Sequence, residues 1–240
     1  MDYATISKTG SRENNEDAFL AAENENGSLF VVADGLGGHG KGEVASAIVT
    51  GTFQRMFSEC DAGRETFIPE AMLAAQDEIM REQRSSCARS DMKTTCAALH
   101  IAGGTYRTGH VGDTRIYVFR KYKVDSRTRD HSVPQMLAMS GEIKERQIRG
   151  HPDRNRLLRV LGIEWDSPLY ELSDALPMDD CQAFLLCSDG FWELCDEKTM
   201  CRRLKKSGNA AQWLEAMASD VERRGGGKDM DNYTAIAVKV

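Results

Sequence analysis

The sequence contains no long apolar run. None of its hydrophobic stretches approaches the roughly 18 to 20 residues that a membrane-spanning helix needs. Residues 1–17 also lack the basic and then apolar pattern of a signal peptide. We therefore expect a cytoplasmic protein that has no membrane partner.

Paired cysteine and histidine motifs are absent as well. The seven cysteines include no C-x-x-C pair, and the five histidines include no H-x-x-x-H pair. Cys96, Cys181 and Cys187 lie in or beside apolar, strand-like runs, so buried reduced thiols are favoured over a zinc or redox site. We assign no metal to the histidines.

What is present describes an ordinary globular chain. Hydrophobic residues make up 41% and charged residues 28% of 240 residues, which excludes disorder and fibres and predicts a single domain over residues 1–240. The net charge is −6, yet the segment from Arg115 to Val160 carries twelve Lys or Arg and five Asp or Glu. Such a basic segment indicates either an anionic substrate or a solvated face. Its few aromatic residues argue against nucleic acid.

Short apolar runs predict strands, and helical periodicity predicts three helices. The helices are expected at about residues 43–60, 69–84 and 210–224. Two of the runs are joined around Gly103 and Gly104, which indicates an antiparallel hairpin. The strands are expected at residues 28–34, 94–102, 105–112, 115–122, 182–189 and 233–240. Residues 127–162 have a polar, basic texture with short helical pieces, typical of an excursion from the sheet.

The glycine-rich stretch LFVVADGLGGHGKGE resembles two nucleotide-binding motifs. Gly35, Gly37 and Gly40 match G-x-G-x-x-G, and Gly35 to Lys41 reads G-x-x-x-x-G-K. A P-loop needs Ser or Thr after its lysine, where this chain has Gly42. Two consecutive helices between strands also disfavour the doubly wound sheet of a nucleotide fold. Both interpretations are therefore rejected.

Several acidic residues share one setting, beside Gly or Asn at the edge of an apolar run. Any single one is more simply a turn-forming residue. If the strands lie side by side, however, these carboxylates converge, and only cations would make the cluster tolerable. Oxygen ligands suit Mg²⁺ or Mn²⁺ rather than zinc. The residues are Glu16, Asp17, Asp34, Asp113, Asp189 and Asp231.

The ordered set of motifs resembles the metal-dependent protein Ser/Thr phosphatases of the PPM, or protein phosphatase 2C, family in their compact bacterial form. The similar stretches run from TGSRENNEDAF through VVADGLGGHGKGEVAS, TTCAAL, GHVGDTRIYVFR, RDHS, HPDRNRLLRVLG and LLCSDGFWE to DNYTAIAV, and so cover nearly the whole chain. The resemblance implies an α+β fold. Its core is an antiparallel β-sandwich flanked by paired helices in four αββα layers, with a small flap at about residues 127–162.

The resemblance also implies roles for individual residues. Asp34 would bridge two metal ions, with the Gly35 carbonyl as a second donor to one of them. Asp189 and Asp231 would ligate the other ion, and Asp113 a third, weaker one. Glu16 and Asp17 would hold metal-bound waters, directly or through other groups. Arg12 resembles the arginine that grips phosphate, which suits the guanidinium fork.

The activity expected from this resemblance is hydrolysis of phosphoserine and phosphothreonine on proteins, reversing a Ser/Thr kinase. Two Mn²⁺ or Mg²⁺ ions would share a water as a bridging hydroxide and aim it at phosphorus. We expect a monomer whose partners are phosphorylated proteins. Two alternatives remain: a non-catalytic binding module that keeps the fold, and a dedicated phosphatase of one regulatory phosphoprotein.

Overall fold

The computed structural model describes residues 1–25, 27–37, 41–59, 65–86, 92–227 and 229–240. Some residues of the glycine-rich stretch and two of the seven cysteines lie outside the described residues. They are Gly38, His39, Gly40, Cys60 and Cys87.

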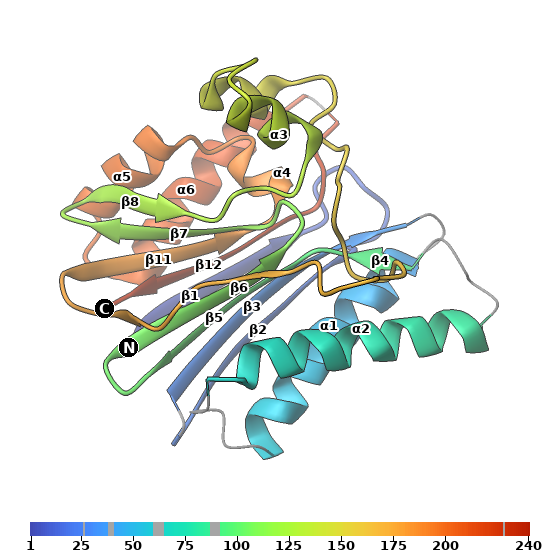
Figure 1. Ribbon diagram of the computed structural model, residues 1–240. Coiled ribbons are helices and arrows are strands. Elements are labelled where there is room, and N and C mark those ends of the chain that lie inside the picture. Colours follow the sequence, from blue (N-terminus) through green and yellow to red (C-terminus); the bar gives the residue numbers. More distant parts are fainter. Residues whose placement is uncertain (26, 38–40, 60–64, 87–91, 228) are drawn as a thin grey trace.

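Two antiparallel sheets pack face to face at the centre of the molecule (Figure 1). The first has the order β1-β12-β11-β7-β8, and the second has the order β10-β6-β5-β3-β2, with β4 added beside β3 and β9 beside β6. The strands of the first sheet are β1 (Asp2–Lys8), β7 (Arg115–Arg120), β8 (Lys123–Arg127), β11 (Cys181–Cys187) and β12 (Tyr233–Lys239). Those of the second are β2 (Asp17–Asn24), β3 (Gly27–Leu36), β4 (Lys93–Thr94), β5 (Cys96–Ala102), β6 (Thr105–Val111), β9 (Glu171–Leu172) and β10 (Leu176–Pro177).

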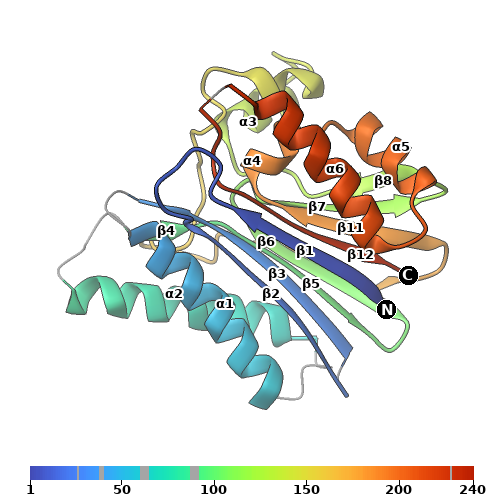
Figure 2. The ribbon, with the colours of Figure 1, turned by 180° about the vertical axis from the view of Figure 1, so that it is seen from behind.

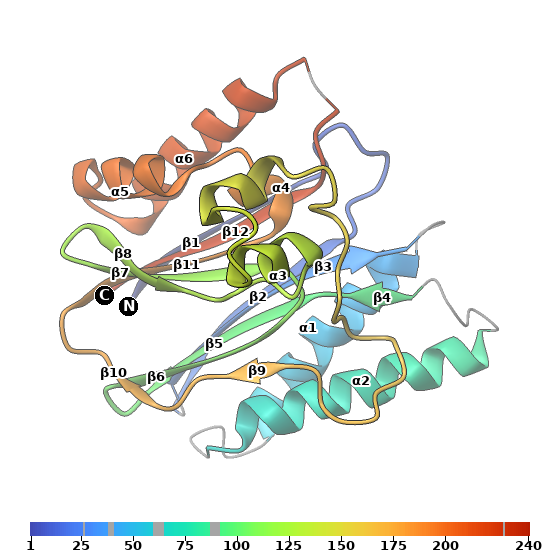
Figure 3. The same cartoon turned by 45° about the horizontal axis from the view of Figure 1, so that its top comes forward.

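Helices cover the outer face of each sheet. The pair α1 (Lys41–Glu59) and α2 (Phe67–Ser85) lies against the second sheet, and α5 (Glu197–Lys206) and α6 (Ala210–Gly225) lie against the first (Figures 1 and 2). Three shorter helices, α3 (Val133–Met139), the 3₁₀ turn η1 (Glu145–Gly150) and α4 (Asp189–Trp192), sit near one end of the sandwich (Figure 3). The expected four αββα layers are confirmed.

The apolar run of β3 shows why the sequence folds into layers. Side chains alternate across a strand. Leu29, Val31 and Ala33 therefore pack under the helices, while Phe30 and Val32 enter the core between the sheets. All five are fully buried. A strand buried on both faces reads as a continuous apolar run, which is the pattern that the sequence has here.

Most predicted elements are present with ends shifted by a few residues. Gly103 and Gly104 form the turn between β5 and β6 with φ of +56° and +75°, so the hairpin is confirmed. The sequence did not predict β1, β2 or α5 as elements. In α5 only Thr199, Met200 and Leu204 of ten residues are buried, so its buried face is narrow and carries few apolar residues from which to predict a helix.

Residues 128–162 leave the first sheet after β8 and return to the second. Ser132 bridges Leu157 within this segment, and Leu161 bridges Thr94 of β4. Arg127 belongs to β8, so the flap expected at about residues 127–162 begins at residue 128. That the flap is a separate subdomain stays a prediction. Among the described residues, no helix combines the length and the apolar character needed to cross a membrane. The described cysteines, 96, 181, 187, 195 and 201, are free thiols, and the first four are buried.

Candidate metal centre

Acidic residues from separate turns line one cavity of about 560 Å³. They come from the loop before β2, the end of β3, the turn between β6 and β7, the start of α4 and the loop before β12. Arg12, Asn155 and Leu157 share the lining, the last two from the flap. The acidic residues are Glu13, Glu16, Asp34, Asp113, Asp189 and Asp231.

Asp34 and Gly35 are held by the backbone around them. The Asp34 amide donates to Thr95 Oγ1 at 3.0 Å, and its carbonyl accepts from the Thr95 amide at 2.9 Å. The Gly35 amide donates to the Glu16 carbonyl at 3.1 Å. A Cβ on Gly35 would lie 2.3 Å from the Gly42 carbonyl oxygen, so a side chain does not fit. Gly42, the second residue of α1, is therefore a close packing partner of Gly35.

Asp189 and Asp231 meet because β11 and β12 are antiparallel neighbours. Asp189 follows the end of β11, and Asp231 precedes the start of β12. A Cβ on Gly190 would lie 2.1 Å from the Asn232 carbonyl oxygen, so glycine permits the close approach of the two segments. The two carboxylates thus line the same side of the cavity from segments more than forty residues apart.

Asn232 ties the N-terminal loop to this pair. Its Oδ1 accepts from the Glu16 amide at 2.8 Å, and its Nδ2 donates to the carbonyls of Thr9 and Asn14, each at 2.9 Å. These three bonds fix the loop that carries Arg12 and Glu16. The sequence placed Asn232 beside Asp231 but gave no sign of this role.

Asp17 differs from the other acids because it does not line the cavity. It pairs with Asp34 in the register of β2 and β3. Its Oδ2 accepts from Ser188 Oγ at 2.8 Å, while its Oδ1 is buried without a hydrogen bond. Burial raises the pKa of Asp17 to about 6. An indirect role behind the cavity fits this position better than direct contact with a metal-bound water.

The Asp113 turn joins the two sheets. Asp113 is 4% exposed, and its carbonyl accepts from Trp192 Nε1 of α4 at 3.0 Å. Its neighbour Thr114 shares a 2.5 Å hydrogen bond with Thr95, whose Oγ1 also accepts from the Asp34 amide. The turn is thereby connected to both Asp34 and α4.

The cavity acids repel one another without enough positive charge nearby. Burial, followed by the charge of Asp17, raises the pKa of Asp34 well above its ordinary value. Burial and Asp113 do the same to Asp189, and burial and Asp130 raise the pKa of Asp113 to about 7. The ionised cluster is therefore unfavourable unless a cation enters it. The orphan oxygen of Asp17 and the all-oxygen donor set fit hard divalent cations.

Arg12 supplies some positive charge at this cavity. Its Nη2 donates to Asp231 Oδ2 at 2.9 Å, and its side chain is 52% exposed. Among the described residues, the cavity carboxylates do not place three ligand oxygens within 4.8 Å of one another. The acids are thus gathered more loosely than a coordination shell, and ion binding would draw them together.

The basic character expected around the flap is offset in part by ion pairs. Twelve basic and five acidic residues leave an excess of seven positive charges between Arg115 and Val160, and three arginines of the flap pair with carboxylates outside this segment. The pairs are Arg149–Glu197 at 2.9 Å, Arg154–Glu193 at 2.7 Å and Arg159–Glu171 at 3.5 Å.

Comparison with known proteins identifies the family. The family described as protein phosphatase 2C matches residues 7–233. The chain belongs to the protein phosphatase 2C family. The serine/threonine phosphatase stp of Listeria monocytogenes is 30% identical over 234 residues, covering 95% of this chain and 91% of that protein. The resemblance inferred from the motifs is confirmed.

Solved structures of the protein phosphatase 2C family share the fold. Stp1 of Staphylococcus aureus superposes with a TM-score of 0.89 and 25% identity, covering 100% of this chain and 95% of that one. The catalytic domain of the phosphatase PstP, described in complex with two manganese ions, gives a TM-score of 0.81 and 27% identity over 99% of this chain and 96% of that one. The α+β fold expected from the resemblance is confirmed.

Proposed function

We propose that this chain hydrolyses phosphoserine and phosphothreonine on proteins in a reaction that requires divalent cations. The observation that carries the proposal is the cavity of carboxylates with raised pKa values, beside which Arg12 offers a half-exposed guanidinium. Membership of the protein phosphatase 2C family supports a phosphatase activity. The alternative of a non-catalytic module is not favoured, because every acidic residue that the motifs require is present in the chain.

The proposed ligands divide between two ions. Asp34 would contact both, the Gly35 carbonyl would complete one site, and Asp189 and Asp231 would hold the other ion. The PstP catalytic domain with two manganese ions supports this number. When bound, such ions lower the pKa of a water and neutralise phosphate charge, with Mn²⁺ and Mg²⁺ as the expected cofactors.

The remaining polar residues would orient the reactants. Glu16, beside the Gly35 backbone, and Asp17, behind Asp34, would accept hydrogen bonds from water or hold ligands in place. Asp113 would contribute to a third, weaker site. Arg12 would bind two phosphate oxygens with its fork, exchanging its contact with Asp231 for the substrate.

The physiological role would be to reverse a Ser/Thr kinase. Its substrates would then be phosphoproteins, in keeping with the names of the relatives. We keep the monomer and the cytoplasm as expectations; the free thiols among the described residues suit a reducing compartment. A dedicated phosphatase of one regulatory phosphoprotein stays a prediction.

The deciding experiment compares p-nitrophenyl phosphate and a phosphothreonine peptide as substrates, with Mn²⁺ and then with EDTA. We expect hydrolysis of both that EDTA abolishes and added Mn²⁺ restores. Turnover that survives EDTA, or none with Mn²⁺, would reject the proposal. Activity confined to one phosphoprotein, with poor rates on generic peptides, would favour the dedicated phosphatase instead.

A further inference from the structure

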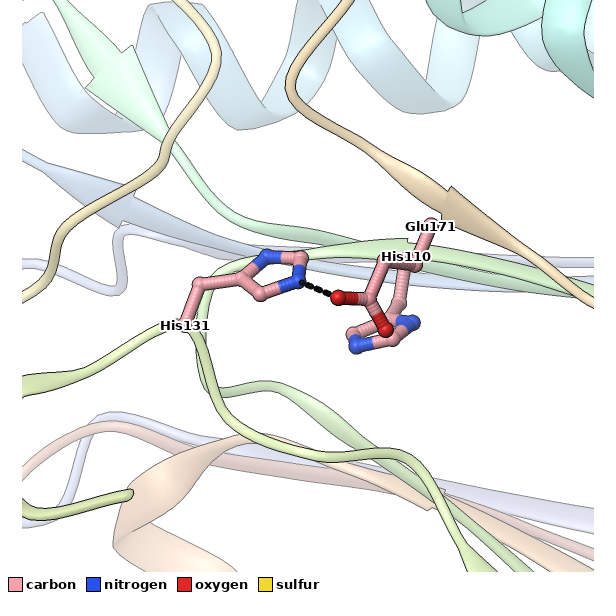
Figure 4. A group of neighbouring side chains, drawn as sticks. All are labelled: His110, His131 and Glu171. Atoms are coloured by element: carbon pink, nitrogen blue, oxygen red, sulfur yellow. Dashed lines mark ion pairs between the residues drawn. The ribbon is translucent and has the colours of Figure 1, made fainter. Parts of the chain in front are cut away.

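A second cluster of titratable side chains lies outside the acidic cavity. His110 at the end of β6, His131 in the flap and Glu171 in β9 come together although they are far apart in sequence (Figure 4). One ligand atom from each lies within 4.8 Å of the others. The imidazole rings stack with centroids 4.7 Å apart and an interplanar angle of 16°.

The hydrogen bonds of His131 determine where its proton sits. Its Nδ1 accepts from the Gly112 amide at 3.2 Å, so Nδ1 has no proton of its own. The neutral ring therefore carries its proton on Nε2, which lies 3.2 Å from Glu171 Oε1. A metal ion on Nε2 would move that proton to Nδ1, against the Gly112 N–H. The cluster thus favours polar contacts over metal binding.

His131 contacts Gly112 at two points. Besides accepting from the Gly112 amide, it donates its own amide to the Gly112 carbonyl at 2.8 Å. Gly112 has φ +95°, and a Cβ there would lie 2.5 Å from the Thr95 side chain. The position accepts only glycine, and the peptide groups on both sides of it are held by one residue. The next residue along the chain is Asp113.

The same residue links this turn to the flap. The carbonyl of His131 accepts from the Leu158 amide at 2.8 Å, next to Leu157 in the cavity wall. Burial and the neighbouring ring of His110 lower the pKa of His131 to about 4, so Nδ1 remains an acceptor near neutral pH.

We propose that His131 is a positioning residue for Asp113: by holding Gly112 through Nδ1 and its backbone, it sets the Asp113 carboxylate in the cavity. This inference rests on the proposed function, in which Asp113 serves the weaker metal site. His131 touches neither metal nor substrate in this role. It acts through the Gly112 peptide groups. Glu171 Oε1 lies 3.2 Å from Nε2, where its negative charge favours the proton on that nitrogen, although Nε2 makes no aligned hydrogen bond.

Paired substitutions separate this role from mere packing. His131→Asn places an amide oxygen near the position of Nδ1, whereas His131→Gln places its oxygen near Nε2 and leaves the Gly112 N–H without a partner. Mn²⁺ binding is measured on the full chain by calorimetry, resolving the tight and weak classes of ion. We expect His131→Gln to weaken the weak class by about tenfold or more, the lower end of effects from residues behind metal ligands.

His131→Asn should restore the weak class to within about threefold of wild type, because it keeps the acceptor. The tight class should be unchanged in both variants. His151→Gln is the matched control, since it makes the same substitution in the flap without a contact to Gly112, and it should bind Mn²⁺ like wild type. Equal effects of Asn and Gln, or no effect of Gln, would overturn the inference.

Substitutions at Glu171 test the proposal if the His131 variants do not fold. Glu171→Leu should then weaken binding of the weak class of Mn²⁺ at least about threefold, while Glu171→Gln should preserve it. Equal binding by these two variants would reject the proposal. Tight one-to-one binding of Zn²⁺ that is lost in His110→Ala would replace it with a metal at the cluster. If wild type binds Mn²⁺ but hydrolyses no phosphoester, the proposed function fails, and the binding comparison still decides the role of His131.

Discussion

Two groups of buried aspartates in this protein have opposite surroundings. Asp34, Asp113 and Asp189 line the cavity, and burial is the main cause that raises their pKa values. The next cause is the charge of Asp17 for Asp34, of Asp130 for Asp113 and of Asp113 for Asp189. Asp130, 5% exposed, lies close by but accepts two hydrogen bonds from the Arg115 guanidinium, at 2.8 and 2.6 Å. Aspartate side chains thus lie beside other carboxylates in the cavity, whereas Asp130 is paired with an arginine.

The acid that is paired with a cation stabilises the fold around the cavity, whereas the unpaired acids are the ones proposed to bind metal. Arg115 also stacks over Trp192, with its guanidinium carbon 3.4 Å from the ring centroid, and Trp192 in turn donates to the Asp113 carbonyl. The matched pair therefore stabilises the turn that carries an unmatched acid. Buried carboxylates that the chain leaves without a cation are the ones expected to receive an external ion. Asp231 would join them by exchanging its contact with the half-exposed Arg12.

The largest effect is expected when one of the carboxylates without a cationic partner is neutralised. Asp34→Asn should lower Mn²⁺-dependent hydrolysis of p-nitrophenyl phosphate by more than about a hundredfold, beyond the usual effect of residues behind metal ligands. The same variant should unfold at a higher temperature than wild type in EDTA, because it relieves repulsion. Calorimetric unfolding and initial rates measure both effects. Activity close to wild type would show that Asp34 is not a ligand.

Removing a matched charge should act on stability instead. Asp130→Asn leaves the buried Arg115 with only the more distant and partly exposed Glu197, at 3.9 Å, as a counter-ion. It should lower the free energy of unfolding by about 3 to 5 kcal/mol, measured by urea denaturation. The control is Asp220→Asn on α6, whose partners Arg203 and Arg223 are partly exposed. We expect it to cost only about 1 kcal/mol, because solvent screens its pairs. Equal losses would contradict the distinction between the two sites.

The pH dependence of stability should have opposite signs in the two groups. Asp17 and Asp113 have pKa values raised to about 6 and about 7, so protonation of the folded state stabilises it below these values. That contribution is fully present below the ordinary aspartate pKa of 3.8 and is lost as the pH rises from there to the folded values of about 6 and about 7. In EDTA the unfolding temperature should therefore fall between about pH 4 and pH 7. Mn²⁺ should reverse the fall by replacing protons.

The matched acid Asp220 gives the contrasting sign. Hydrogen bonds from Arg203 and Arg223 hold its pKa well below its usual value of 3.8. Its contribution is present above the ordinary pKa and is lost only as pH falls below it. Asp220→Asn should therefore leave the slope between pH 6 and 7 unchanged. If Asp220→Asn changed that slope, Asp220 rather than Asp17 and Asp113 would be responsible for the pH dependence of stability.

The smallest expected effect tests the rejected P-loop interpretation. Lys41→Ala should leave Mn²⁺-dependent hydrolysis within about threefold of wild type, because the proposed chemistry assigns this lysine no contact with phosphate. Initial rates at saturating Mn²⁺ measure it. A loss as large as that of Asp34→Asn would return the lysine to the site.

Much of the fold could be predicted from local pattern. The run over Leu29 to Ala33 and the glycines at 103 and 104 predicted their strand and hairpin, because side-chain alternation and positive φ are local properties. The strand Asp2–Lys8 was missed because it lies at a sheet edge and each of its residues is exposed or only partly buried. Its pairing with β12, more than two hundred residues away, has no local signal.

The sequence predicted the acidic residues of the candidate site but not the residues that hold them in place. Glycine or asparagine beside each acid marked Asp34, Asp189 and Asp231 in the sequence. Asn232 and Thr95 were missed, because an amide or hydroxyl becomes a support only when another segment presents its backbone at hydrogen-bond distance. The pairing of His110 with His131 was missed for the same reason.

Residue type and order are enough to predict the family, the alternation that builds two sheets and the identity of the acidic residues. Which of these acids remain without a cationic partner depends on the folded arrangement of the chain. Asp34 lies near the end of β3 and Asp130 shortly after β8, yet Asp34 faces other carboxylates and Asp130 faces an arginine. Electrostatic energy depends on distance and burial, which the order of residues fixes only through the folded chain.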